Sequence, residues 1–345
     1  MPRSTIEEVA ALAGVSRSTV SRVVNGSTAV SAEALAAVQR AIAELNYAPN
    51  RAARSLASRN TQAIGLVVPE DTTRFFGDPF LASVVAGIGA RLADSDYILN
   101  LLIANDDAGG KMVRFVRNGA VDAAIIVSHH ASDTFVESIA DAVPVVFGGR
   151  PAVLRDTDIV IDVDNAAAAR EAVAHLLALG RRRIATITGT MTMSVSMDRR
   201  DGFLAELADA GLESAGEVDG GFSEQGGADA ARQLLAQPEV PDAIFAASDL
   251  MARGAIAVLR SAGLRVPEDV AVIGFDDSVV ATASDLTSVR QPMFHQGEIL
   301  AELTIDLLSG HRPPPLTLLP TELVVRGSAP AAENQGSARN RTSAR

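Results

Sequence analysis

The chain has 345 residues, of which 48% are hydrophobic, with a formal net charge of −12 and no cysteine. Its length is enough for about two to three folded units, and the lack of cysteine excludes disulfide bonds and thiolate metal sites. The charge is unevenly divided, because residues 1–60 hold seven arginines and four glutamates, a balance of +3 that leaves −15 for the rest. A small basic segment attached to an acidic body suits a protein whose local positive charge meets phosphate groups.

The first segment, residues 5–25, predicts two helices joined by a very short turn. Thr5 and Glu8 have the spacing of a capping box, in which each side chain satisfies a free backbone donor of the other. Gly14 suits a left-handed helix end, and Ser16 can cap a second helix that starts directly after it. This pattern is typical of a helix-turn-helix.

The second of these helices has an exposed face of basic, hydroxyl and amide side chains with no acid among them. That face consists of Arg17, Ser18, Ser21, Arg22 and Asn25. Such side chains hydrogen-bond to base edges and phosphates, so we expect this helix to contact double-stranded DNA. The alternative is an ordinary three-helix fragment without a DNA role.

A third helix is predicted after Ser31, with Val30 and Leu35 at hydrophobic-staple spacing. Its buried stripe is expected to consist of Leu35, Val38, Ile42 and Leu45. Pro49 ends this helix, and the residues after Asn50 predict one more short helix. A helix this short is marginal alone, so we expect it to form only on DNA or against a second copy of the chain.

These stretches resemble the lactose-repressor (LacI/GalR) family of bacterial transcription regulators, in the order and spacing of Ala13–Ser16, Ser18–Asn25, Tyr47–Asn50 and Ala53–Leu56. The resemblance implies that the second helix enters the major groove, and that the short hinge helices of a dimer enter the minor groove. There Leu56 would part a central base step, a wedge that bends the duplex. The residues expected at the DNA are Thr5, Ser16, Arg17, Ser18, Thr19, Ser21, Arg22, Asn25, Ser31, Tyr47, Asn50, Arg54 and Leu56. One departure is Ala34-Leu35, where the family often has Thr-Arg.

From Thr61 onward, short apolar runs alternate with amphipathic helical stretches. Examples of the apolar runs are Ala63–Val68, Ala123–Val127 and Val270–Gly274. This alternation predicts an α/β fold with parallel sheets covered on both faces, and such sheets bind ligands beyond the ends of their strands. The run is long enough for two sheets.

The body also resembles the family's effector domain, a two-subdomain type I periplasmic-binding-protein-like fold. The resemblance is carried by runs that include Asp78–Phe80, Asp162–Asn165, Asp198-Arg199, Ser248–Ala252 and Val289–Pro292. It implies a helix-turn-helix domain over 1–48, a hinge over 49–60 and an effector and dimerisation domain over 61–328. Within that domain, one subdomain would comprise 62–160 and 292–320, and the other 161–291 and 321–328, with three crossings at a hinge. Residues 329–345 are small, polar and basic, and predict a disordered tail.

Arg199 and Asp276 are the pair most expected to hold a ligand, because the resemblance places both in the cleft. A carboxylate accepts from neighbouring sugar hydroxyls, and a guanidinium donates in a fixed fork. The alternative is a plain salt bridge between the two subdomains. Ser248 stands where relatives commonly have asparagine, and we expect Asp249 to cap the helix that follows.

Further candidates for the cleft follow the first and third strands. Phe76 or Phe80 could stack on a pyranose ring and Asp78 could accept a hydroxyl, and the reading of both phenylalanines as core residues is equally open. His129 is a candidate hydrogen-bonding group. His130 lies next to it, but two adjacent histidines without a third ligand do not predict a metal site.

The sequence therefore predicts a ligand-responsive transcription regulator, in which a sugar releases a repressor of carbohydrate-utilisation genes from a near-palindromic operator. Other metabolites, such as a nucleoside, remain alternatives for the ligand. The rival classes are a solute-binding protein without a DNA role and an enzyme. No catalytic constellation, cofactor motif or metal-ligand spacing is present in the sequence.

The tail lacks leucine heptads, so we expect a homodimer. Glu7 and Glu8 interrupt the apolar core that a signal peptide would need at the start of the chain. No apolar run reaches membrane-spanning length. We therefore expect a cytoplasmic, nucleoid-associated protein with no membrane partner.

Overall fold

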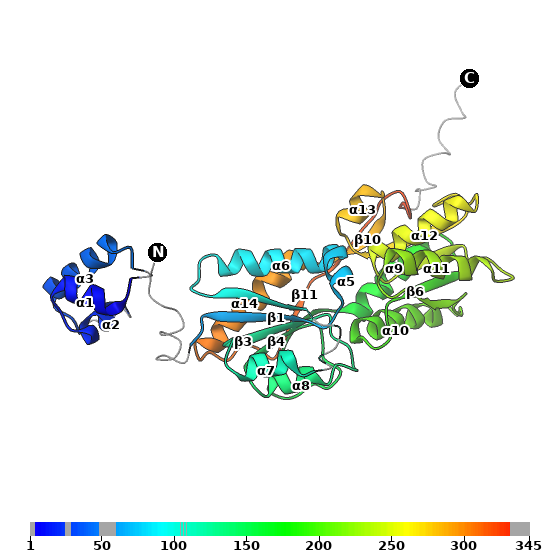
Figure 1. Cartoon of the computed structure of the whole chain (residues 1–345). Coiled ribbons are helices and arrows are strands. Elements are labelled where there is room, and N and C mark those ends of the chain that lie inside the picture. Colours follow the sequence, from blue (N-terminus) through cyan, green and yellow to red (C-terminus); the bar gives the residue numbers. More distant parts are fainter. Residues whose placement is uncertain are drawn as a thin grey trace, which may run out of the picture. The chain divides into compact units, whose positions relative to one another are not determined.

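A computed structural model of the chain (Figure 1) describes residues 4–24, 29–47, 60–103, 105, 107 and 109–331. The chain divides into two compact units, Met1–Thr61 and Gln62–Arg345. Among the described residues, no helix is long and apolar enough to cross a membrane.

The first unit contains helices α1 (Ile6–Ala13), α2 (Arg17–Val24) and α3 (Ala32–Glu44). The predicted capping box is present, since the Thr5 hydroxyl accepts from the Glu8 amide and the Glu8 carboxylate accepts from the Thr5 amide. Gly14 ends α1 with φ of 66°, and the Ser16 hydroxyl accepts from the Thr19 amide at the start of α2. Val9, Val20 and Val38, one from each helix, are fully buried and form the centre of this small core. The helix-turn-helix prediction is confirmed.

One core assignment in α3 is wrong. Leu35 is 40% exposed and does not belong to the core, which on this helix consists of Val38 and Ala41 with Ile42 packed beside them. Leu35 lies in the first turn, and its amide donates to the Ser31 carbonyl. The buried face of α3 therefore begins one turn later than the apolar pattern indicates.

The second unit contains two six-stranded sheets. The first has the order β11-β5-β4-β3-β1-β2 and is parallel throughout. Its strands are β1 (Ala63–Val68), β2 (Ile98–Ile103), β3 (Ala123–Val127), β4 (Val145–Gly148), β5 (Ile159–Val163) and β11 (Leu316–Leu319). Figure 1 shows α5 (Thr72–Gly77), α6 (Pro79–Leu92) and α14 (Met293–Leu308) on one side of this sheet, and α7 (Lys111–Arg117) and α8 (Phe135–Ala140) on the other. These elements form the amino-terminal subdomain.

The second sheet has the order β12-β10-β9-β8-β6-β7, in which only the β10–β12 pair is antiparallel among the described strands. Its strands are β6 (Ile184–Thr188), β7 (Glu217–Asp219), β8 (Ala243–Ala246), β9 (Ala271–Asp276), β10 (Thr287–Arg290) and β12 (Glu322–Val324). Helices α9 (Asn165–Ala178) and α10 (Ser194–Asp209) pack together, as do α11 (Glu224–Leu235) and α12 (Asp249–Ser261), and α13 (Val279–Ala283) follows β9. These elements form the carboxy-terminal subdomain.

The chain crosses between the subdomains after β5, after β10 and between β11 and β12. The sequence placed the first crossing after residue 160, but β5 continues to Val163 because Ile161 and Val163 pair with β11 in the first sheet. The ordered body also extends past the expected start of the tail. Ala329 is fully buried, and its carbonyl accepts from the His175 ring and the Thr287 hydroxyl. The remainder of the expected tail, 332–345, lies outside the described residues.

Candidate functional site

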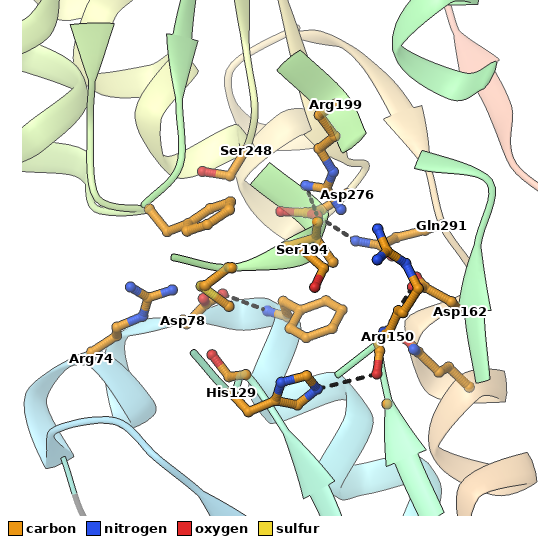
Figure 2. A pocket seen from close by; sticks show the side chains of 18 residues that line it. Arg74, Asp78, His129, Arg150, Asp162, Ser194, Arg199, Ser248, Asp276 and Gln291 are labelled. Atoms are coloured by element: carbon orange, nitrogen blue, oxygen red, sulfur yellow. Dashed lines mark hydrogen bonds and ion pairs between the residues drawn. The ribbon is translucent and has the colours of Figure 1, made fainter. Parts of the chain in front are cut away.

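A cleft of about 680 Å³ lies between the two subdomains, with polar side chains converging from both (Figure 2). It opens beyond the carboxyl ends of the strands, where parallel sheets place their ligands. The residues that line it include Arg74, Asp78, Phe80, Ser128, His129 and Arg150 from the first subdomain, Ser194, Arg199, Phe222, Ser248 and Asp276 from the second, and Asp162, Gln291 and Gln296 near the crossings.

Arg199 and Asp276 lie at the floor of the cleft, within the carboxy-terminal subdomain. Arg199 projects from α10, and its Nη1 lies 4.0 Å from Oδ1 of Asp276 at the end of β9. The guanidinium also donates to the Asn165 side chain at 2.9 Å and to the Ala247 carbonyl at 2.7 Å, and it covers the Phe275 ring at 3.5 Å from the centroid. Because both residues belong to the same subdomain, the alternative of a salt bridge between subdomains is wrong.

Burial dominates the electrostatics of this pair. It raises the pKa of Asp276 well above 3.8, with Asp249 adding to the rise and Arg199 opposing it. Burial likewise lowers the pKa of Arg199 from its ordinary value, and Asp276 and Asp162 counteract the shift. Asp276 has φ of 111°, an uncommon left-handed backbone for a residue with a side chain. The fold therefore holds a desolvated carboxylate in a fixed position facing the cleft.

The predicted residues after β1 separate into two groups. Asp78 and Phe80 both line the cleft, and the Asp78 carboxylate accepts from the Phe80 amide at 2.9 Å, which caps α6. Burial raises the pKa of Asp78, and the hydrogen bond from the Phe80 amide opposes the rise. Phe76 is 76% exposed, packs edge-on against Phe75 and does not line the cleft. Its assignment to the effector site, and the alternative of a core role, are both wrong because α5 turns this ring toward solvent.

His129 lies in the wall of the cleft and is buried. Its Nε2 is 3.2 Å from the Gly149 carbonyl, and its ring packs edge-on against Phe147. Burial lowers the pKa of His129, so the neutral imidazole is favoured. A carbonyl only accepts, so Nε2 carries the proton and Nδ1 is left as an acceptor.

Ser248, and not Asp249, caps the helix that follows. Ser248 caps α12 by accepting from the Met251 amide, and it also lines the cleft. Asp249 is not the cap, because it is the first residue of the helix and its carboxylate points into the core. There it accepts from the amide and hydroxyl of Ser278 and from the hydroxyl of Ser288. Burial raises the pKa of Asp249 to about 6, against the lowering effect of these hydrogen bonds.

Several residues of the cleft were given no role from the sequence. Gln291 donates to Asp276 at 2.6 Å, and Asp162 accepts from Asn165, which in turn holds Arg199. Both residues lie in runs that carried the family resemblance, so that resemblance was the available signal. Phe222 and Arg150 lie in loops, where no periodic pattern marks them, and only the folded chain brings them to the cleft.

Residues expected at the DNA also have structural roles in the first unit. Hydroxyls gather at the start of α2, where Ser16 Oγ lies 2.7 Å from Ser18 Oγ and 2.9 Å from Thr19 Oγ1. Ser31 caps α3, and Tyr47 packs against the small core. The Arg17 guanidinium lies 3.3 Å from the Glu7 carboxylate in an exposed pair. Asn25, Asn50, Arg54 and Leu56 lie outside the described residues.

Comparisons with known proteins cover both units. Residues 5–50 match the family described as bacterial regulatory proteins, lacI family, and residues 173–329 match a periplasmic binding protein-like domain. The HTH-type transcriptional regulator CelR of Thermobifida fusca is 42% identical over 336 residues, which is 94% of this chain and 98% of that protein. A solved complex of the transcriptional regulator CelR with cellobiose has a TM-score of 0.75 and 40% identity, covering 94% of this chain and all of that one. The lac repressor dimer bound to operator and the anti-inducer ONPF has a TM-score of 0.83 and 30% identity, covering 96% of this chain and all of that one.

Proposed function

The chain belongs to the lacI family of bacterial regulatory proteins and is a DNA-binding transcriptional regulator, and we propose that it represses carbohydrate-utilisation genes until a neutral sugar releases it from its operator. The observation that carries the ligand proposal is the cleft itself. It joins the buried Arg199–Asp276 pair to the aromatic rings of Phe80 and Phe222. Fixed donors and acceptors suit hydroxyl groups, and aromatic faces suit the apolar face of a sugar ring.

The charge balance of the cleft favours an uncharged ligand. Among the described residues that line it, each arginine has a carboxylate partner: Arg74 pairs with Glu70, Arg150 with Asp198 and Arg199 with Asp276. A phosphorylated sugar would need a cation that is not already neutralised. Asp78 and Asp162 add further acceptors, which would repel a phosphate and accept hydroxyl protons.

The lining of the cleft suits a sugar, since a few fixed polar groups stand beside the aromatic rings of Phe80 and Phe222. A regulator 42% identical to this chain is CelR, and a solved CelR complex contains cellobiose. We therefore propose cellobiose or a closely related β-linked disaccharide as the effector.

The proposal for the DNA side assigns the operator contacts to α2 and the hinge. Two copies of the chain would present two recognition helices to a near-palindromic operator, as in the lac repressor dimer bound to its operator. A ligand in the cleft would change the angle between the subdomains and thereby separate the hinge helices, so that Leu56 no longer fits the minor groove. The coupling is reciprocal, so operator DNA should weaken sugar binding by the same factor. In this role the protein acts in the cytoplasm and has no enzymatic activity.

Isothermal titration calorimetry of the full chain tests the ligand proposal. The ligands are cellobiose, lactose, ribose and glucose 6-phosphate, titrated under the same conditions. We expect saturable binding of cellobiose and none of the phosphorylated sugar. Binding of the phosphorylated sugar in preference to every neutral one would overturn the neutral-sugar assignment.

A further inference from the structure

Glu70 is a buried carboxylate outside the lining of the cleft. It follows the end of β1 and is 5% exposed. Its Oε1 accepts from the Ser128 hydroxyl at 2.7 Å, lies 3.2 Å from Nε2 of His130 and lies 3.2 Å from Nε of Arg74. All three partners belong to the amino-terminal subdomain, and Arg74 and His130 are themselves largely buried.

Two of these partners, His130 and Arg74, also contact the carboxy-terminal subdomain across the cleft. Nδ1 of His130 lies 2.8 Å from the Thr192 hydroxyl, and the neighbouring Ala131 amide donates to the Thr192 carbonyl at 2.8 Å. Arg74 donates from Nη1 to the Gly221 carbonyl at 3.3 Å, and its guanidinium lies over the Phe222 ring at 5.2 Å from the centroid. A single carboxylate therefore holds two side chains that bridge the subdomains at different points.

The chemistry of Glu70 fixes how those bridges are made. A carboxylate only accepts, so a neutral His130 must direct its Nε2 proton to Glu70, which leaves Nδ1 to accept from the Thr192 hydroxyl. The same carboxylate orients the Arg74 guanidinium, so that one Nη faces Gly221 and the flat face covers Phe222. Loss of the carboxylate would free both side chains at once.

We propose that Glu70 is a positioning residue that latches the cleft in its closed form, acting through His130 and Arg74 rather than on the ligand. The inference rests on the proposed function only in that the cleft binds an effector. An effector that binds the closed form is retained longer when the latch holds. Glu70 therefore controls how long the sugar stays bound, while Arg199 and Asp276 control whether it is recognised.

Labelled full-length protein tests the latch directly. The chain has no cysteine, so cysteines introduced by Glu137→Cys on α8 and Asp201→Cys on α10 can carry spin labels in the two subdomains. Both positions are exposed. Pulsed electron paramagnetic resonance then reports the distance between subdomains. We expect Glu70→Met, which keeps the length of the side chain but removes the acceptor, to shift the distances of the sugar-free protein to longer values.

Kinetics of cellobiose release give the second measurement. Stopped-flow dissociation should be roughly tenfold faster in Glu70→Met, the loss expected for a hydrogen bond to a charged group, with the association rate unchanged. Thr192→Val removes the hydroxyl partner from the other subdomain without touching Glu70 or Arg74. It should give a smaller change in the same direction, and the double variant should fall short of the sum. Thr192→Val also keeps the test open if Glu70→Met does not fold.

The matched control is Glu302→Gln, which removes an exposed carboxylate that faces Arg91 at 3.7 Å within the amino-terminal subdomain. It should change neither the distances nor the release rate. Unchanged distances and release in both Glu70→Met and Thr192→Val would overturn the latch. If the parent protein binds no cellobiose, the proposed ligand fails, and the label distances still decide the latch.

Discussion

Arg199 and Asp276 face the cleft from the same subdomain, the one from the second turn of α10 and the other from the end of β9, with 4.0 Å between their charged groups. The pair is thus assembled whether the cleft is open or closed. Recognition of the ligand can begin on the carboxy-terminal subdomain, and closure then adds Asp78, Phe80 and His129 from the other side.

Arg199→Lys should lower the affinity for the sugar by on the order of 100-fold, the cost of disrupting a buried charge pair. Lysine keeps the charge but cannot reach the Asn165 side chain, the Ala247 carbonyl and Asp276 with one ammonium group. Calorimetry measures the change. Arg200→Lys is the control, because Arg200 is the next residue in the chain but its guanidinium pairs with Glu217 at the surface. Parent-like affinity in Arg199→Lys would remove Arg199 from the site.

Asp198→Asn should weaken sugar binding only about fivefold, because surface ion pairs contribute roughly 1 kcal/mol or less. Asp198 accepts two hydrogen bonds from Arg150 across the cleft, at 2.7 and 2.9 Å, and both side chains are partly exposed. Added salt should bring the parent toward the variant. Asp229→Asn, which removes the surface pair with Arg232 within α11, should leave binding unchanged. A salt-independent difference would contradict an electrostatic origin.

Asp249→Asn should change how stability depends on pH. In the folded protein the pKa of Asp249 is about 6, against 3.8 ordinarily, so protonation favours the folded state. This contribution is complete below about pH 4 and is lost as the pH rises through about 6. Asparagine is neutral throughout, so its melting temperature relative to the parent should be higher at pH 7.5 than at pH 4.5. The free energy of unfolding of the variant relative to the parent should change by on the order of 2 kcal/mol between the two pH values. A constant difference between the two pH values would show that Asp249 does not titrate in this window.

Leu56→Ala should sharply lower the affinity for the operator with little loss of folding, if the side chain acts as a wedge in the minor groove. Gel-shift titration with a specific fragment and a scrambled fragment separates the wedge from general phosphate binding. The affinity for the scrambled fragment should stay close to that of the parent. An unchanged affinity for the operator would refute the wedge.

Much of the fold was predictable because its signals are local. The capping box at Thr5, the left-handed Gly14 and the apolar runs of the strands act within a few residues of themselves. Local signals also explain the errors. The apolar pattern could not reveal that Leu35 is exposed, or that Asp249 turns inward to Ser278 and Ser288, which are far along the chain.

The site was predictable only where a family resemblance supplied positions. Arg199 and Asp276 are 77 positions apart, and nothing in their neighbourhoods shows that they meet. Contacts between the subdomains, such as His130 with Thr192 and Arg74 with Gly221, had no signal of either kind. These contacts depend on the relative orientation of the two subdomains, which the three chain crossings between them determine together.

The most direct test of the central claim is a fluorescence-anisotropy titration of the full chain against a promoter fragment from its own locus, repeated with saturating cellobiose. Tight binding that cellobiose weakens in the parent, but not in Arg199→Lys, is the expected result. Failure to bind the fragment with or without the sugar, or equal binding in both conditions, would contradict the claim that occupancy of this cleft controls the affinity for DNA.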